Sequence, residues 1–77
     1  MSKINLEVKG YSVNLSGSDI AAMRLLKKED GARFAHLNND GIDLATQGLI
    51  RKRSAYRGSL TRLGRHVLDQ IGEEEVL

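Results

Sequence analysis

The sequence predicts an α+β fold in which a β-hairpin precedes three or four helical segments and a basic β-excursion. Two runs of alternating apolar and polar residues open the chain, which indicates the hairpin. Apolar residues at helical spacing follow in the middle and near the end of the chain. A cluster of basic residues lies between the last two helical segments, where a short pair of strands is expected.

The 77 residues suffice for one small domain without cysteine, so apolar packing must hold it together with no disulfide or zinc–thiolate site. We expect a hairpin at 1–15, a helical core with the basic excursion at 16–71, and a frayed acidic tail at 72–77. The start of the chain lacks the pattern of a signal peptide, and no run approaches the roughly 20 apolar residues of a membrane span. We therefore expect a cytoplasmic protein without membrane contact.

The hairpin is predicted from Ile4–Val8 and Tyr11–Leu15, with only Lys9 and Gly10 between them. An isolated hairpin is marginal in water, so its apolar face must pack on the rest of the domain or on a second chain. That face is expected to hold Ile4, Leu6, Val8, Tyr11, Val13 and Leu15.

The first helix is predicted to begin at Ser16, which forms a capping-box pattern with Asp19, although Ser18 is an alternative N-cap. Residues 29–31 end it. The stripe expected in the core contains Ile20, Ala22, Met23, Leu25 and Leu26.

A second, short helix is predicted over 32–37, followed by a turn over 38–41. A further helix follows and stops at Gly48, which favours a left-handed C-cap. Its buried face is expected to contain Ile42, Ala45 and Leu49.

Residues 50–55 are predicted to form a strand and residues 56–59 a flexible loop, with Leu60 beginning the return. Thr61 is the expected N-cap of the last helix. The buried stripe of this helix is expected to contain Leu63, Val67, Leu68 and Ile71, and its outward face Arg62, Arg65, His66, Asp69 and Gln70.

The net charge of +2 conceals a segregated pattern. Residues 51–65 include basic residues and no acid, whereas residues 67–77 include acids and neither Lys nor Arg. This asymmetry predicts one basic face and an acidic tail. The plainer interpretation is a solvated surface whose charges keep an edge strand from aggregating.

The segments 48–53, Gly-Leu-Ile-Arg-Lys-Arg, and 60–64, Leu-Thr-Arg-Leu-Gly, resemble the bacterial winged helix-turn-helix regulators, especially the MarR-like group. In those proteins a Gly-Leu-Ile/Val turn leads into a basic wing strand, and a Leu-Thr-x-x-Gly pattern opens the next helix. The resemblance covers about residues 15–71. It implies that Leu49 and Ile50 pack between helix and wing, and that Gly64 lets the last helix approach a neighbour closely.

The chain also departs from that family. The region 31–47 is shorter than the usual helix-turn-helix, and a hairpin replaces the first of the long dimerisation helices. The chain is therefore similar in size to phage and plasmid regulators rather than to a complete MarR repressor.

The basic cluster predicts phosphate binding, because arginine suits phosphate groups and narrow minor grooves. If 40–47 is a recognition helix, Asn39 and Gln47 are candidates to contact base edges. Residues 38–47 contain no Lys or Arg and two acids, Asp40 and Asp43, which favours cap and turn roles instead. The wing and last-helix candidates are Arg51, Lys52, Arg53, Tyr56, Arg57, Arg62 and Arg65.

Catalysis is not expected. His36 and His66 have no ligand-spaced partners, so no metal is expected, and the acids show no paired arrangement. Neither a P-loop nor a dinucleotide glycine pattern is present, so no cofactor is expected.

The leading hypothesis is a small DNA-binding protein that regulates transcription, contacts double-stranded DNA through the wing and dimerises through the hairpin. The alternative is a phage or mobile-element winged helix that docks on a host protein and inhibits or modulates it, since the acidic segment and tail suit a basic partner. RNA binding through the same wing is a third possibility.

Overall fold

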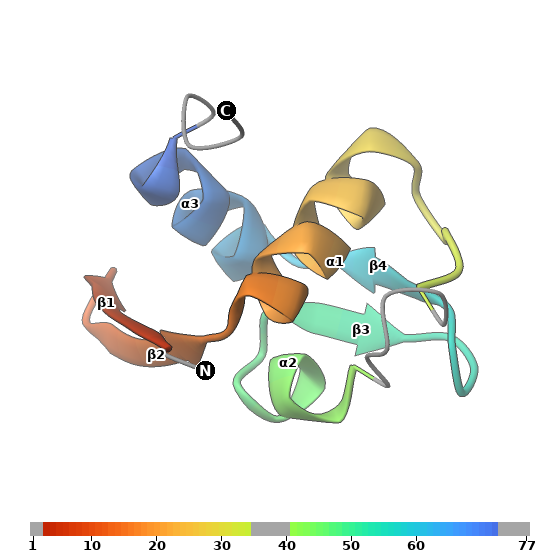
Figure 1. Ribbon diagram of the computed structural model, residues 1–77, viewed down its shortest axis with the longest axis horizontal. Helices are drawn as coiled ribbons and strands as arrows, with labels where there is room; N and C mark the ends of the chain where they lie inside the picture. The colour runs from red at the N-terminus through yellow and green to blue at the C-terminus, as the bar shows by residue number, and fades with distance from the viewer. Residues whose placement is uncertain (1–2, 35–40, 73–77) are drawn as a thin grey trace.

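The protein, in a computed structural model that describes residues 3–34 and 41–72, has the predicted α+β class (Figure 1). A hairpin and a second small sheet combine with three helices in these residues. Helices α1 and α3 pack on each other, α3 also packs on the hairpin, and α2 lies against the second sheet. The elements are β1 (Ile4–Val8), β2 (Tyr11–Leu15), α1 (Gly17–Lys28), α2 (Ile42–Thr46), β3 (Ile50–Lys52), β4 (Gly58–Leu60) and α3 (Arg62–Ile71).

The β1–β2 hairpin is confirmed in position and turn length. Lys9 and Gly10 have φ angles of 55° and 81°, the left-handed conformation that a two-residue hairpin turn requires. The register places all six apolar residues on one face, as predicted, through the pairs Ile4↔Leu15, Leu6↔Val13 and Val8↔Tyr11.

The apolar face of the hairpin is covered chiefly by the chain's own helices. Strand β1 packs against α3 and β2 against α1, so Val8, Val13 and Leu15 are buried in the common core. Ile4 and Tyr11 stay 43% and 59% exposed. The hairpin is therefore a structural part of this domain before any second chain is considered.

Helix α1 begins with the predicted capping box. The Asp19 N–H donates to Ser16 Oγ at 3.1 Å, and the Ser16 N–H donates to Asp19 Oδ2 at 3.0 Å. Ser16 is thus the N-cap and the alternative at Ser18 is wrong. The helix ends at Glu29, and the predicted stripe is buried, with Leu25 partly so.

The helix predicted over 32–37 is wrong where the structure describes it, at 32–34, and the remainder lies outside the described residues. The chain here is extended: Ala32 and Phe34 are buried while Arg33 is exposed and forms a β-bridge with Arg57. The Phe34 N–H donates to the Tyr56 carbonyl at 2.9 Å. Burial of Phe34 and pairing with a distant segment therefore override the local helical pattern.

Helix α2 is shorter than predicted and buries a different residue. Gly48, with φ of 78°, ends it as expected, but Leu44 is fully buried and Ile42 is 54% exposed. The helix closes after Thr46, and the Leu49 N–H then donates to the Leu44 carbonyl at 2.9 Å. Leu49 is consequently buried from the turn that follows the helix and not from the helix itself.

The second sheet is also shorter than the predicted strand, and its loop comes earlier. The N–H groups of Arg53 and Ser54 both donate to the Arg57 carbonyl, at 2.8 and 3.3 Å, and this closes the loop. Gly58 lies within β4 rather than in the loop, and a Cβ there would come within 2.9 Å of the Arg51 carbonyl oxygen, so the position favours glycine. We call residues 50–60 the basic ribbon.

Helix α3 begins as predicted at Thr61, whose Oγ1 accepts from the Gly64 N–H at 3.1 Å and donates to the Gly48 carbonyl at 2.7 Å. A Cβ on Gly64 would lie 2.3 Å from the Leu49 carbonyl oxygen, so α3 approaches the α2–β3 junction as closely as the sequence implied. The predicted stripe faces the core, with Val67 and Leu68 buried and Leu63 and Ile71 partly buried. None of the helices in 3–34 and 41–72 is long and apolar enough to cross a membrane.

Candidate nucleic-acid interface

The two faces of the basic ribbon differ in chemistry. The antiparallel register pairs Ile50 with Leu60 and Arg51 with Ser59. Because side chains alternate along a strand, Ile50 and Leu60 enter the core and Arg51 projects to the opposite, exposed face. The ribbon therefore turns Arg51 outward while Ile50 and Leu60 anchor it in the core, and Lys52, on the face of Ile50, is half-buried.

Two arginines of the ribbon are tied to the loop after α1. Arg53 Nη2 lies 3.2 Å from Asp30 Oδ2, an ion pair in which both side chains are more than half exposed. Arg57 Nη1 donates to the Gly31 carbonyl at 3.3 Å. These contacts fix the end of the ribbon, and Asp30 offsets part of its positive charge.

Arg33 joins this basic surface although the sequence analysis did not select it. Its backbone bridges that of Arg57, and its side chain is exposed. The sequence feature that could have indicated this extended segment is the alternation of apolar and polar residues over 32–34. Three residues are too few to separate a strand from a helix on periodicity.

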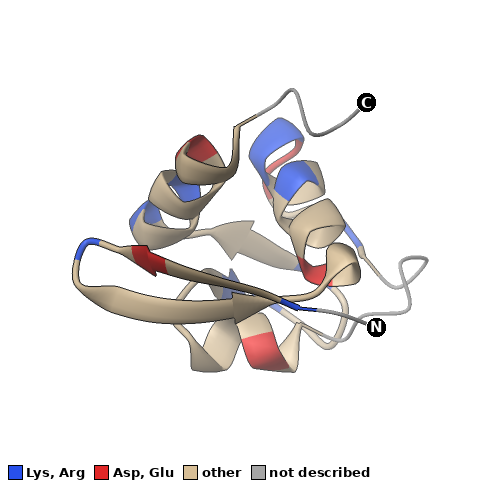
Figure 2. Cartoon of the chain, turned by 60° about the vertical axis from the view of Figure 1, so that its left-hand side comes forward, with Lys and Arg blue, Asp and Glu red and all other residues tan. Residues whose placement is uncertain are grey.

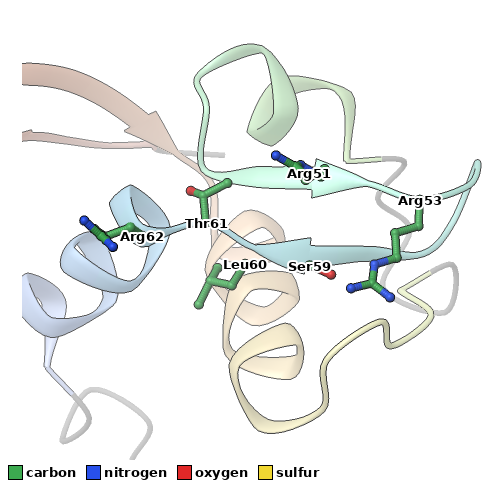
Figure 3. A pocket seen from close by; sticks show the side chains of 6 residues that line it. All are labelled: Arg51, Arg53, Ser59, Leu60, Thr61 and Arg62. Atoms are coloured by element: carbon green, nitrogen blue, oxygen red, sulfur yellow. The ribbon is translucent and has the colours of Figure 1, made fainter.

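A hollow of about 320 Å³ lies where the basic ribbon meets the start of α3 (Figure 3). Arg51 of β3 and Arg53 of the following loop line it on one side. Arg62, the first residue of α3, also lines it. Within the described part of the chain, Arg51 and Arg62 have no carboxylate in ion-pair range. The residues that line the hollow are Arg51, Arg53, Ser59, Leu60, Thr61 and Arg62.

The other predicted basic and aromatic residues lie around this centre. Arg65 is exposed on α3, where Figure 2 shows basic segments in the first half of the helix and an acidic one toward its end. Lys52 is half-buried on the ribbon, and Tyr56 is 46% exposed in its loop. These residues extend the basic surface but do not line the hollow.

Gln47 is engaged within the protein. Its side-chain Oε1 accepts from the Asn14 N–H at 2.7 Å, and its Nε2 donates to the Asn14 carbonyl at 3.1 Å. Nε2 also lies 3.2 Å from the Asp43 carbonyl. The amide therefore joins α2 to the hairpin, while the other candidate for base contact, Asn39, lies outside the described residues.

Helix α2 adds no positive charge to the surface. Its only charged residue is Asp43, which lies 4.0 Å from Lys3 Nζ, and Figure 2 shows a red segment but no blue one on this helix. No group of three or more potential metal ligands occurs among residues 3–34 and 41–72. His66 is half-buried on α3, and His36 lies outside the described residues.

Comparisons of the chain with protein-family models, curated proteins and solved structures find no match. Function is therefore inferred from the chain's own charges and geometry.

Proposed function

We propose that this chain is a small DNA-binding domain of the winged helix-turn-helix type, which contacts DNA phosphates through the basic ribbon and the start of α3. The observation that carries the proposal is that Arg51 and Arg53 of the ribbon and Arg62 of α3 line one open hollow. Guanidinium groups match phosphate oxygens in geometry and charge. A transcription regulator acting in the cytoplasm is the role that such a domain would fill.

The order of the strands supports the winged-helix assignment. The segment carrying Arg57 lies between Arg53 on one side and Arg33 on the other. The basic ribbon is thus joined by an extended segment that follows α1, an arrangement compatible with a winged helix. In this assignment the ribbon is the wing.

Contacts to phosphates, rather than to base edges, dominate this binding mode. Helix α2 has only an acidic charge, and the Gln47 amide is occupied by the hairpin. Contacts to phosphates position a protein on DNA without selecting a sequence. We therefore expect binding to depend steeply on salt and weakly on base sequence.

The test is fluorescence anisotropy on mixed duplex DNA at several salt concentrations. The variant Arg51→Gln/Arg53→Gln/Arg57→Gln should lose most of the affinity, and the slope of log K against log salt should fall by about three. A matched control, Lys3→Gln/Lys27→Gln/Lys28→Gln, removes the same charge from outside the ribbon. Equal losses of affinity in the two variants, or no DNA binding at low salt, would reject the proposal. Competition with structured RNA then distinguishes RNA binding from DNA binding.

Docking on a host protein remains the second candidate function, because α2 exposes Ile42 beside Asp43. An exposed apolar side chain next to an acid suits a partner with a basic rim. Capture of one stoichiometric partner that resists nuclease and is lost in Ile42→Ser would favour this function.

Dimerisation would use Ile4 and Tyr11 on the hairpin, and light scattering of the purified protein tests it.

A further inference from the structure

The geometry points to a discrete seat for one phosphate group in the hollow between the basic ribbon and α3, formed by Arg51, Ser59 and Arg62. Its role as a contact to the DNA backbone rests on the proposed function. Its affinity for a tetrahedral oxyanion does not, because that affinity depends only on the side chains lining the hollow.

An unsatisfied hydroxyl lies at the hollow. Ser59 Oγ is buried and has no hydrogen-bond partner among the described residues. Buried polar groups are nearly always paired, so this hydroxyl is available to a water or to a bound oxygen. Ser59 lines the hollow, and its hydroxyl can take any of three staggered χ1 rotamers.

Two arginines at the hollow carry charge that no carboxylate of the described residues offsets. Arg51 lies directly across the sheet from Ser59, and Arg62, the first residue of α3, lines the same hollow. Neither residue has a carboxylate partner among the described residues, whereas Arg53 is already paired with Asp30. In Figure 3 the Arg62 side chain extends outward, and an exposed arginine changes rotamer within nanoseconds. Arg51, Arg62 and the Ser59 hydroxyl therefore belong to residues that line the same hollow.

The N-terminus of α3 also lies at the hollow. Thr61 caps the helix by accepting from the Gly64 N–H, which leaves the N–H groups of Arg62 and Leu63 without intrahelical partners. Thr61 and Arg62 line the hollow, so this first turn opens at its edge. Helix N-termini stabilise phosphate through such free N–H groups, and here they add to the arginines and the hydroxyl.

The experiment is an NMR titration of the ¹⁵N-labelled protein with inorganic phosphate, compared with chloride at equal ionic strength. We expect phosphate-specific shifts at residues 59–63 and at Arg51. Ser59→Ala and Arg62→Gln should each weaken phosphate binding, Arg62→Gln by about tenfold, since a hydrogen bond between charged groups is lost. Both substitutions should leave the dispersion of the spectrum unchanged, because neither removes an apolar contact.

The chain offers a matched control for each variant. Ser54→Ala removes an exposed hydroxyl from the same ribbon, and Lys28→Gln removes an exposed charge from α1, yet neither residue lines the hollow. Both controls should bind phosphate like the unmodified protein. Shifts that are equal for phosphate and chloride, or that persist in Ser59→Ala and Arg62→Gln, would overturn the seat.

A parallel titration with duplex DNA separates the seat from the proposed function. For a backbone contact at the seat, Arg62→Gln should lower the slope of log K against log salt by about one, and Lys28→Gln by less. DNA binding that neither Ser59→Ala nor Arg62→Gln weakens would reject the seat as a contact to the DNA backbone and leave the proposed function standing. Phosphate-specific shifts without DNA binding would reject the proposed function and establish the seat as a site for free phosphate.

Discussion

The two antiparallel strand pairs share a backbone arrangement but differ in their side chains. The β1–β2 hairpin directs six apolar residues to one face, and α1 and α3 cover most of that face. The basic ribbon buries Ile50 and Leu60 and turns arginines to solvent. The hairpin thus stabilises the domain, whereas the ribbon presents charge. Alternation along a strand decides which of these tasks a two-stranded unit performs.

Both units are fastened to the same short segment after α2. The Gln47 amide holds the hairpin at Asn14, and the Thr61 hydroxyl holds the start of α3 at Gly48. The ribbon therefore leaves the core from a point fixed on two sides. These contacts therefore position the backbone from which the arginine side chains of the ribbon extend.

The largest expected effect is on the close approach that positions α3. Gly64→Ala places a Cβ within 2.3 Å of the Leu49 carbonyl oxygen, so the helix or the junction must move. We expect a loss of about 3 kcal/mol in the free energy of unfolding, measured by urea denaturation. Gly17→Ala, at a helical glycine with no atom within 4 Å, is the control and should cost almost nothing. Equal stability of the two variants would contradict the observed packing of α3.

The next prediction separates the two strand pairs directly. Leu15→Ala, in the fully buried part of the hairpin, should cost about 3 kcal/mol of stability but leave the salt slope of DNA binding unchanged for the folded protein. Arg51→Gln should change stability by less than about 0.5 kcal/mol and lower the salt slope by about one. Urea denaturation and anisotropy on both variants check this. A ribbon variant that unfolds, or a hairpin variant that alters the slope, would remove the distinction.

Gln47→Ala tests whether α2 belongs with the structural or the contact region. Loss of the two hydrogen bonds to Asn14 should cost about 1 kcal/mol of stability without changing the affinity of the folded protein for DNA. Gln70→Ala, exposed on α3, serves as the control. Reduced DNA affinity at unchanged stability would instead support a base contact by Gln47.

The smallest effect is expected at the acid that neutralises part of the ribbon. Asp30→Asn removes the ion pair with Arg53 and should raise DNA affinity about threefold at low salt, because one arginine charge is released. Stability should change by less than about 1 kcal/mol, as for other exposed ion pairs. Asp69→Asn, which removes a partner of Lys27 on the helical side, is the control. A fall in affinity on Asp30→Asn would mean that the pair orients Arg53 for binding.

The features that the sequence predicted correctly are local. The hairpin follows from alternation around a two-residue turn, and the caps at Ser16 and Thr61 follow from short side-chain patterns. The family resemblance predicted that Gly64 lets the last helix approach a neighbour closely, and the packing of α3 confirms this.

The features that the sequence did not predict depend on distant contacts. Arg33 pairs with a segment 24 residues away, and the partner of Gln47 lies 33 residues away. Leu44 replaces Ile42 in the core because α2 is too short for its spacing to define a face. The cluster of basic residues is visible in the sequence. That Arg51, Arg53 and Arg62 line one hollow depends on the tertiary position of α3.

The most direct test of the contrast between the two strand pairs is an NMR map of the backbone amides on addition of duplex DNA. We predict that the shifts concentrate in the basic ribbon and the first turn of α3, and that the hairpin residues 4–15 are unaffected. Shifts concentrated in the hairpin or in α2, or no shifts at low salt, would contradict the assignment of the ribbon as the DNA-binding surface.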